Sequence, residues 1–118
     1  MMKKIYYLKT CDTCKRIMKE VGVDDSFELQ NIKESLITSE QLEQLKGRVN
    51  SYEELFNKQS RVYKSEKLKE QDLSEDDIKN WILKEYTLLK RPIFLFDDAI
   101  FIGNSKKNVQ SLQEYLNA

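Results

Sequence analysis

Hydrophobic and polar positions change their spacing several times along the chain, and each change predicts a new secondary-structure element. Residues 3–9 (KKIYYLK) form a short β-branched and aromatic run flanked by charge, which is typical of a strand. From Asp12 the apolar positions follow the spacing of a helix face, which Gly22 is suited to end. Residues 26–32 (SFELQNI) predict a second strand, so the chain opens in the order β-α-β.

The segment that follows is polar and mainly helical. Thr38 is suited to cap a helix that Gly47 would end, and residues 51–57 (SYEELFN) predict another helical turn or two. Residues 58–72 are charged and have no strong period, which indicates a loop with a short helix.

A capping-box pattern then predicts a longer helix. Ser74 is followed three residues later by Asp77, an arrangement typical of a helix start. The positions that we expect on the buried face of this helix are Ile78, Trp81, Ile82 and Leu89.

The end of the chain returns to strands and closes with a helix. Residues 92–96 (PIFLF) and 99–103 (AIFIG) are apolar runs separated by Asp97 and Asp98, which predicts a hairpin. Residues 105–116 (SKKNVQSLQEYL) then have helical spacing. The summed order is β-α-β, a helical block and β-β-α, which indicates an α/β fold.

Composition and charge narrow the function classes. The chain has 118 residues, 40% of them hydrophobic, which suits one domain with a packed core. Its 20 basic and 20 acidic residues cancel, so we expect no direct nucleic-acid partner and no membrane partner. No apolar run approaches the length of a membrane span and no signal peptide is evident, which predicts a cytoplasmic protein.

The chain contains no histidine, which excludes a Ser-His-Asp or Cys-His catalytic unit and any histidine-based metal site. Its two cysteines cannot complete a four-thiolate zinc site alone, so we expect no metal site. A reducing compartment disfavours a structural disulfide, which directs attention to thiol chemistry.

Both cysteines lie in YYLKTCDTCKR, at the predicted junction of the first strand and the first helix. A helix N-terminus favours a thiolate, and Lys9, Lys15 and Arg16 add positive charge, so we expect a lowered pKa for Cys11. Cys14 stands one turn later on the apolar face and should be the more buried thiol. This geometry predicts that Cys11 attacks and Cys14 resolves. The alternatives are that both cysteines merely pack as small apolar residues, or that they bind zinc.

The only proline, Pro92, lies immediately before the third predicted strand. A cis bond between Arg91 and Pro92 would turn the chain sharply from helix into strand, whereas an ordinary trans proline could open an edge strand. The forked, permanently charged side chain of Arg91 suits a thiolate or an oxyanion.

Three segments, YYLKTCDTCKR, ELFNKQSRVYK and KRPIFLFDDAIFIGNSKKNV, resemble the arsenate reductase family of thioredoxin-like proteins. This is the glutaredoxin-dependent ArsC group with its relatives Spx and YffB. The resemblance implies one thioredoxin-like domain, residues 1–118, with a mixed four-stranded sheet and a helical insertion at about 33–90. It also implies that the nucleophilic cysteine falls on Cys11 and that the conserved Arg–cis-Pro pair falls on Arg91 and Pro92.

The chain departs from the arginine pattern of this family. Arsenate reductases of the group carry three arginines around the oxyanion, and Arg91 matches one of them. Asn57 stands at the middle position and Asn104 at the last, while Arg61 and Lys58 lie close enough in the middle segment to substitute.

Two functions follow from the resemblance. The first is a thiol-dependent oxidoreductase, in which the Cys11 thiolate attacks an oxyanion or disulfide and Arg91 stabilises the anion. The second is an Spx-like redox-sensing regulator that binds RNA polymerase and uses Cys11 and Cys14 as a switch; Cys14 favours this reading, since family arsenate reductases commonly lack a second thiol. The residues expected to bind substrate are Lys15, Arg16, Asn57, Arg61 and Pro92.

The oxidoreductase hypothesis implies no bound metal or organic cofactor. The expected external reductant is glutathione with glutaredoxin, or thioredoxin. The expected partners are a small oxyanion or a protein or glutathione disulfide, together with glutaredoxin, and the protein is expected to act as a monomer.

Overall fold

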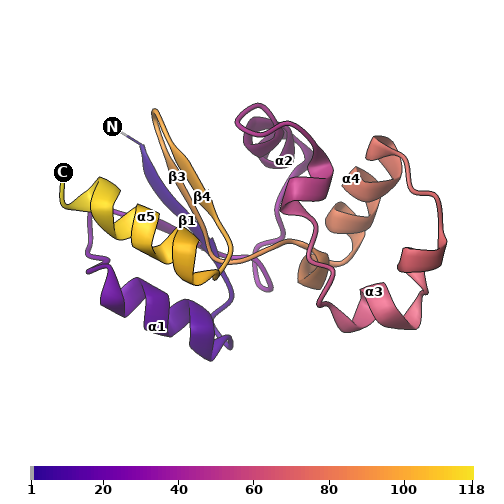
Figure 1. The fold of residues 1–118 in the computed structure, drawn as a ribbon, viewed down its shortest axis with the longest axis horizontal. Coiled ribbons are helices and arrows are strands. Elements are labelled where there is room, and N and C mark those ends of the chain that lie inside the picture. Colours follow the sequence, from indigo (N-terminus) through magenta and orange to yellow (C-terminus); the bar gives the residue numbers. More distant parts are fainter. Residues whose placement is uncertain (1) are drawn as a thin grey trace. The chain divides into compact units, whose positions relative to one another are not determined.

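A computed structural model describes residues 2–118 and divides the chain into two compact units (Figure 1). The first unit combines Met1–Ser35 with Arg91–Ala118, and the second is Leu36–Lys90. The second unit falls within the segment of about 33–90 that the resemblance marks as a helical insertion. The assignment of one domain over residues 1–118 stays a prediction.

The first unit is built on a mixed four-stranded sheet with the order β2-β1-β3-β4. Strand β1 pairs in parallel with β2 and antiparallel with β3, and β3 pairs antiparallel with β4. The mixed four-stranded sheet is therefore confirmed. The strands are β1 (Lys3–Tyr7), β2 (Glu28–Asn31), β3 (Ile93–Phe96) and β4 (Ile100–Ile102).

The strand directions bring four chain segments to one edge of the sheet. Since β1 and β4 both run antiparallel to β3, they run in the same direction, as does β2. The carboxyl ends of β1, β2 and β4 therefore lie at the same edge as the start of β3. We call this edge the thiol edge, because the β1–α1 junction that carries Cys11 lies there.

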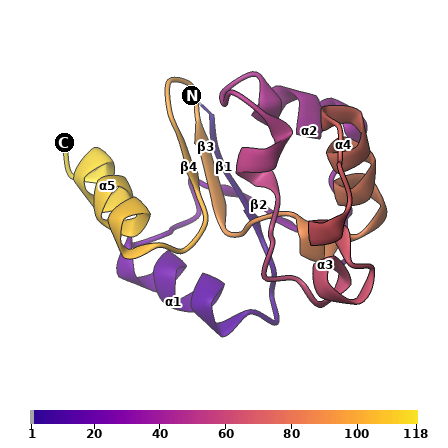
Figure 2. The same cartoon turned by 45° about the vertical axis from the view of Figure 1, so that its right-hand side comes forward.

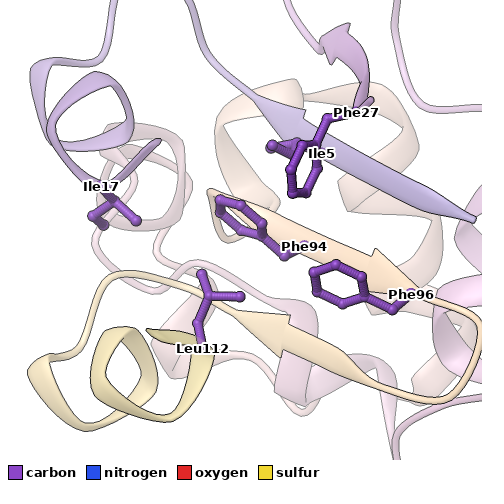
Figure 3. Close-up of a cluster of buried hydrophobic side chains, with 6 residues drawn as sticks. All are labelled: Ile5, Ile17, Phe27, Phe94, Phe96 and Leu112. Carbon is purple, nitrogen blue, oxygen red and sulfur yellow. The ribbon is translucent and has the colours of Figure 1, made fainter. Parts of the chain in front are cut away.

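Two helices, α1 (Asp12–Glu20) and α5 (Lys106–Leu116), follow β1 and β4 and start near the thiol edge (Figure 1). They pack on one face of the sheet, where Ile17 of α1 and Leu112 of α5 meet Phe94 of β3 (Figure 3). The rings of Phe27 and Phe94 meet edge to face, with centroids 6.2 Å apart. The full buried cluster is Ile5, Ile17, Phe27, Phe94, Phe96 and Leu112.

Both predicted opening strands are longer than the observed ones. Strand β1 ends at Tyr7, and β2 begins only at Glu28. Ahead of β2, the backbone N–H of Ser26 donates to Asp24 Oδ1 at 2.9 Å and the N–H of Phe27 donates to the Asp24 carbonyl at 3.2 Å. This local turn occupies residues that alternate like a strand in the sequence.

The second unit is helical, and its two longest helices start where the sequence predicts. Thr38 forms a capping box with Gln41, and Ser74 forms one with Asp77 (Figure 2 shows both helices). Its elements are α2 (Ser39–Lys46), η1 (Tyr52–Leu55), α3 (Arg61–Ser65), η2 (Leu68–Glu70), α4 (Glu75–Lys84) and η3 (Tyr86–Leu88).

One expected helix position is wrong. Leu89 does not belong to the buried face of α4, because that helix ends at Lys84 and Glu85 is extended, with φ −127° and ψ 107°. Leu89 instead follows the short 3-10 helix η3 and forms an isolated antiparallel bridge with Phe56. Leu89 is nevertheless buried. The helical spacing of apolar residues therefore extends past Lys84, where the helix itself ends.

Within residues 2–118 the structure contains no helix with the length and hydropathy that a membrane crossing requires.

Candidate active site

The side chain of Cys11 stands at the N-terminus of α1. Cys11 is the N-cap residue, with φ −93° and ψ 111°, and its side chain is partly exposed. Its N–H donates to the Leu8 carbonyl at 3.0 Å, and its carbonyl accepts from the Lys15 N–H at 3.2 Å. The turn Leu8–Cys11 thus closes directly onto the helix and presents the thiol at the helix start.

The environment of Cys11 favours its thiolate. Partial burial raises the pKa of Cys11, but the backbone N–H and thiol of Cys14 and the charge and hydrogen bond of Arg91 lower it. The net pKa of Cys11 lies below the ordinary value of 9.0. Cys11 makes no side-chain capping hydrogen bond. Its sulfur nevertheless lies near donors from Cys14 and Arg91 that stabilise the negative charge of a thiolate.

Cys14 is the buried member of the pair, as its helix phase predicts, and its side chain is 0% exposed. Burial, together with the hydrogen bond to Cys11 and the charge of Cys11, raises the pKa of Cys14 to about 12, while a backbone hydrogen bond from Leu8 and the charge of Arg91 lower it. Both cysteines are free thiols. Cys14 therefore remains protonated and donates toward Cys11.

Arg91 and Pro92 reach this site from the start of β3. The Arg91–Pro92 peptide bond is cis. Of the cis and trans forms considered from the sequence, this is the form that the family resemblance implies. Arg91 is partly buried and donates a side-chain hydrogen bond to Cys11, across 80 residues of sequence. The carbonyl of Pro92 accepts from the Gly103 N–H at 2.9 Å, which joins the end of β4 to the same edge.

The two cations that follow the cysteines in sequence lie on the surface of α1. Arg16 pairs with Glu20 at 3.4 Å, one turn further along the helix, and both side chains are largely exposed. Lys15 is exposed near the start of α1. The main groups that lower the pKa of Cys11 are Cys14 and Arg91 instead.

Asn57 and Arg61 belong to the second unit. The side-chain amide of Asn57 donates to the Thr87 carbonyl at 3.0 Å and accepts from the Gln59 N–H at 3.0 Å. The backbone N–H of Asn57 donates to the Leu88 carbonyl at 2.7 Å. Asn57 thereby fixes the loop before α3 to η3. Arg61 is the exposed first residue of α3.

Neighbouring Lys58 is held by an ion pair of 2.6 Å to Glu53. Asn104 is exposed between Gly103 and the Ser105 N-cap of α5, at the thiol edge.

The sequence did not single out Asn31, the last residue of β2. Its Oδ1 accepts from the Lys9 N–H at 3.2 Å, and its carbonyl accepts from the N–H groups of Glu34 and Ser35 at 3.1 and 2.9 Å. Asn31 thus braces the β1–α1 turn that carries Cys11. An asparagine at a strand end carries no sequence signal for such a contact, because its partner is set by strand pairing.

The two pKa shifts predict a single thiol titration below pH 9.0. The alkylation rate of the protein by iodoacetamide should rise through the lowered pKa of Cys11 and then level off, because Cys14 ionises only near 12. Absorbance at 240 nm should show the same midpoint. Two thiolates appearing together above pH 9 would contradict this assignment.

Comparison with known proteins supports the family resemblance. A model of the ArsC family matches residues 6–112, while no curated protein matches the chain. Among solved structures, an arsenate reductase from Vibrio cholerae is 18% identical with a TM-score of 0.76, and the match covers 97% of each chain.

Two further solved structures match over nearly the whole chain. An arsenate reductase (ArsC) related protein from Brucella melitensis is 21% identical with a TM-score of 0.70, covering 94% of this chain and 93% of that one. A Staphylococcus aureus protein is 27% identical with a TM-score of 0.72, covering 93% of this chain and 97% of that one. The expected thioredoxin-like α/β fold is confirmed.

Proposed function

The chain belongs to the ArsC family, and from this premise we propose that it is a thiol-dependent oxidoreductase whose nucleophile is Cys11. One observation carries the proposal: a partly exposed thiol at a helix N-terminus has a lowered pKa and contacts both Arg91 and a second, buried thiol. A thiolate stabilised in this way is the form that attacks sulfur or an oxyanion.

With a disulfide substrate, the Cys11 thiolate attacks one sulfur, a new S–S bond forms, and the other sulfur leaves with the electron pair as a thiolate. With an oxyanion substrate, Cys11 bonds to the central atom and an oxygen leaves as water after protonation. Arg91 stabilises the negative charge in both cases. A second thiol then attacks the adduct, and its oxidation with Cys11 to a disulfide supplies the two electrons that reduce the substrate.

The second thiol is Cys14 or an external thiol. Glutathione with glutaredoxin, or thioredoxin, would return Cys11 to its reduced state, and neither a metal nor an organic cofactor takes part. A cytoplasmic location is part of the proposal, since the reaction needs a compartment that keeps Cys11 and Cys14 reduced.

The proposal is tested by incubating the purified protein with glutathione disulfide and, separately, with arsenate plus glutathione and glutaredoxin. We expect glutathionylation of Cys11, detected by mass spectrometry, and oxidation of NADPH when glutathione reductase is coupled to turnover. An authentic arsenate reductase serves as the positive control. Failure in both assays, with the control active, would exclude the oxidoreductase.

A redox-sensing regulator is the second candidate, because the buried Cys14 contacts Cys11 and could close a disulfide with it. This function requires a protein target such as RNA polymerase. A pull-down with the reduced and the oxidised protein should then recover polymerase subunits in only one state; recovery of none in either state would remove this candidate.

A further inference from the structure

Exposed lysines gather around the thiol edge of the first unit. Lys9 follows β1, Lys15 lies near the start of α1, and Lys106 and Lys107 open α5; all are exposed. We call these residues the lysine rim. Among the ion pairs between described residues, none involves a member of the rim.

The start of α5 is fixed to the same edge as Cys11. Gly103, at the end of β4, donates its N–H to the Pro92 carbonyl at 2.9 Å, and the Asn108 amide of α5 donates to the Gly103 carbonyl at 2.9 Å. Lys106 lies three residues after Gly103, so their Cα atoms are at most about 11 Å apart. In Figure 1 both α1 and α5 start near this end of the sheet.

Negative charge in this unit lies mainly at the opposite edge. Asp24 precedes β2, and Asp97 and Asp98 form the β3–β4 turn, both at the edge where β1 begins. Two carboxylates of this unit, Glu34 and Asp12, lie at the thiol edge. Glu34 follows Lys33 directly, so their charges offset each other, and Asp12 remains as the one that opposes the lysine rim. The unit is therefore electrically polarised although the whole chain has a formal net charge of zero.

The rim does not serve helix stability. Lys106 and Lys107 occupy the first turn of α5, where the positive end of the helix dipole disfavours cations. The first turns of α2 and α4, by contrast, carry acidic residues. Two lysines that are locally unfavourable, unpaired by any described carboxylate and placed at the same edge of the sheet as a reactive thiol point to a role in attracting a negative charge.

We propose that the lysine rim accelerates the approach of negatively charged disulfides to Cys11, so that the protein discriminates among disulfides by their charge. The inference rests on the proposed function and narrows its substrate class. Arg91 acts on charge at the reacting atom, whereas the rim spans two helices and acts on charge carried elsewhere on the substrate. The exchange step is unchanged: Cys11 bonds to one sulfur and the other leaves as a thiolate.

The test compares two disulfide probes, the dianion 5,5′-dithiobis(2-nitrobenzoate) and the dication cystamine, on the full chain. Raising the ionic strength from about 10 mM to about 1 M shortens the Debye length from about 30 Å to about 3 Å. We expect the rate with the dianion to fall about tenfold and the rate with cystamine to rise. Reaction with neutral iodoacetamide, measured alongside, corrects for any change in the thiolate fraction.

Matched charge reversals then locate the effect. Lys107→Glu should lower the corrected low-salt rate with the dianion several-fold, and Lys106→Glu should act alike. Lys19→Glu makes the same change on the last turn of α1, away from the thiol edge, and should leave that rate near wild type. Glutamate suits the first turn of α5, so both rim variants should fold.

The outcomes separate the two proposals. If Cys11 reacts with both probes but the corrected rates do not depend on salt or on Lys106 and Lys107, the rim is overturned and the oxidoreductase stands. If Lys19→Glu slows the reaction with the dianion as much as Lys107→Glu does, the effect comes from the net charge of the protein, and the proposal for the lysine rim is likewise overturned. If Cys11 reacts with neither probe, the proposed function fails and the rim with it.

Discussion

Replacing Cys11 by serine should abolish thiol exchange and alkylation, whereas replacing Cys14 by serine should leave the first attack within a few-fold of wild type. A serine hydroxyl does not ionise near neutral pH, so Cys11→Ser removes the nucleophile itself. Cys14 stays protonated, with a pKa raised to about 12, and donates a hydrogen bond toward Cys11. A serine at that position keeps both the donor and an acceptor for the Leu8 N–H. Rates with iodoacetamide and a disulfide probe measure the difference.

The second step distinguishes the role of Cys14. In wild type, a Cys11 adduct should decay to a Cys11–Cys14 disulfide, whereas in Cys14→Ser the adduct should persist until an external thiol is added. Intact-mass spectrometry follows both species, and circular dichroism verifies that each variant is folded. Equal loss of the first attack in both variants would show that the two thiols do not have the separate roles assigned to them.

The position of Cys11 could be predicted because its site is largely made from contiguous residues. The change from strand-like to helical spacing after Thr10 places a junction at Cys11, and the helix phase places Cys14 on the buried face. Helix capping is equally local, which explains why Thr38 and Ser74 were identified as N-caps.

Contacts across long sequence separations could not be predicted in the same way. Lys15 and Arg16 are near Cys11 in sequence, but Arg16 points along α1 toward Glu20, while the cation that contacts Cys11 is Arg91. Only the pairing of β1 with β3 brings Arg91 to the thiol, and spacing within the chain does not encode strand order. The sequence singled out Arg91 by its charge and its place beside the only proline, and the family resemblance implied that it belongs with Cys11.

The local contacts of Asn57 show a further limit of sequence reasoning. The resemblance places it at an arginine position of the oxyanion site, yet its amide hydrogen bonds to Thr87 and Gln59 hold a loop of the second unit. An asparagine can both donate and accept hydrogen bonds, but which partners it finds depends on how the loop folds, and the family pattern does not encode that. The wrongly placed Leu89 has a similar origin, since burial continued while the backbone changed from helix to extended.

Removing the guanidinium with Arg91→Met should raise the pKa of Cys11 and slow its reaction with a disulfide or oxyanion by about 100-fold. Two losses combine: the positive charge of Arg91 no longer favours the thiolate, and its hydrogen bond to Cys11 is absent. The sign follows directly, because a group that lowers the pKa stabilises the ionised thiol, so its removal shifts the pH–rate curve to higher pH. The profile should be measured from pH 5 to about pH 10, with the rate at the plateau reported separately.

Two matched variants separate the role of charge from that of geometry. Arg91→Lys keeps the charge but loses the planar fork, so the pKa of Cys11 should recover more fully than the plateau rate does. Arg16→Met removes an arginine much nearer in sequence, whose guanidinium pairs with Glu20, and should leave the pKa of Cys11 near wild type. A pKa that moves with Arg16 and not with Arg91 would mean that the cation acting on Cys11 comes from α1. In that case the cis-proline edge of β3 would have no part in activating the thiol.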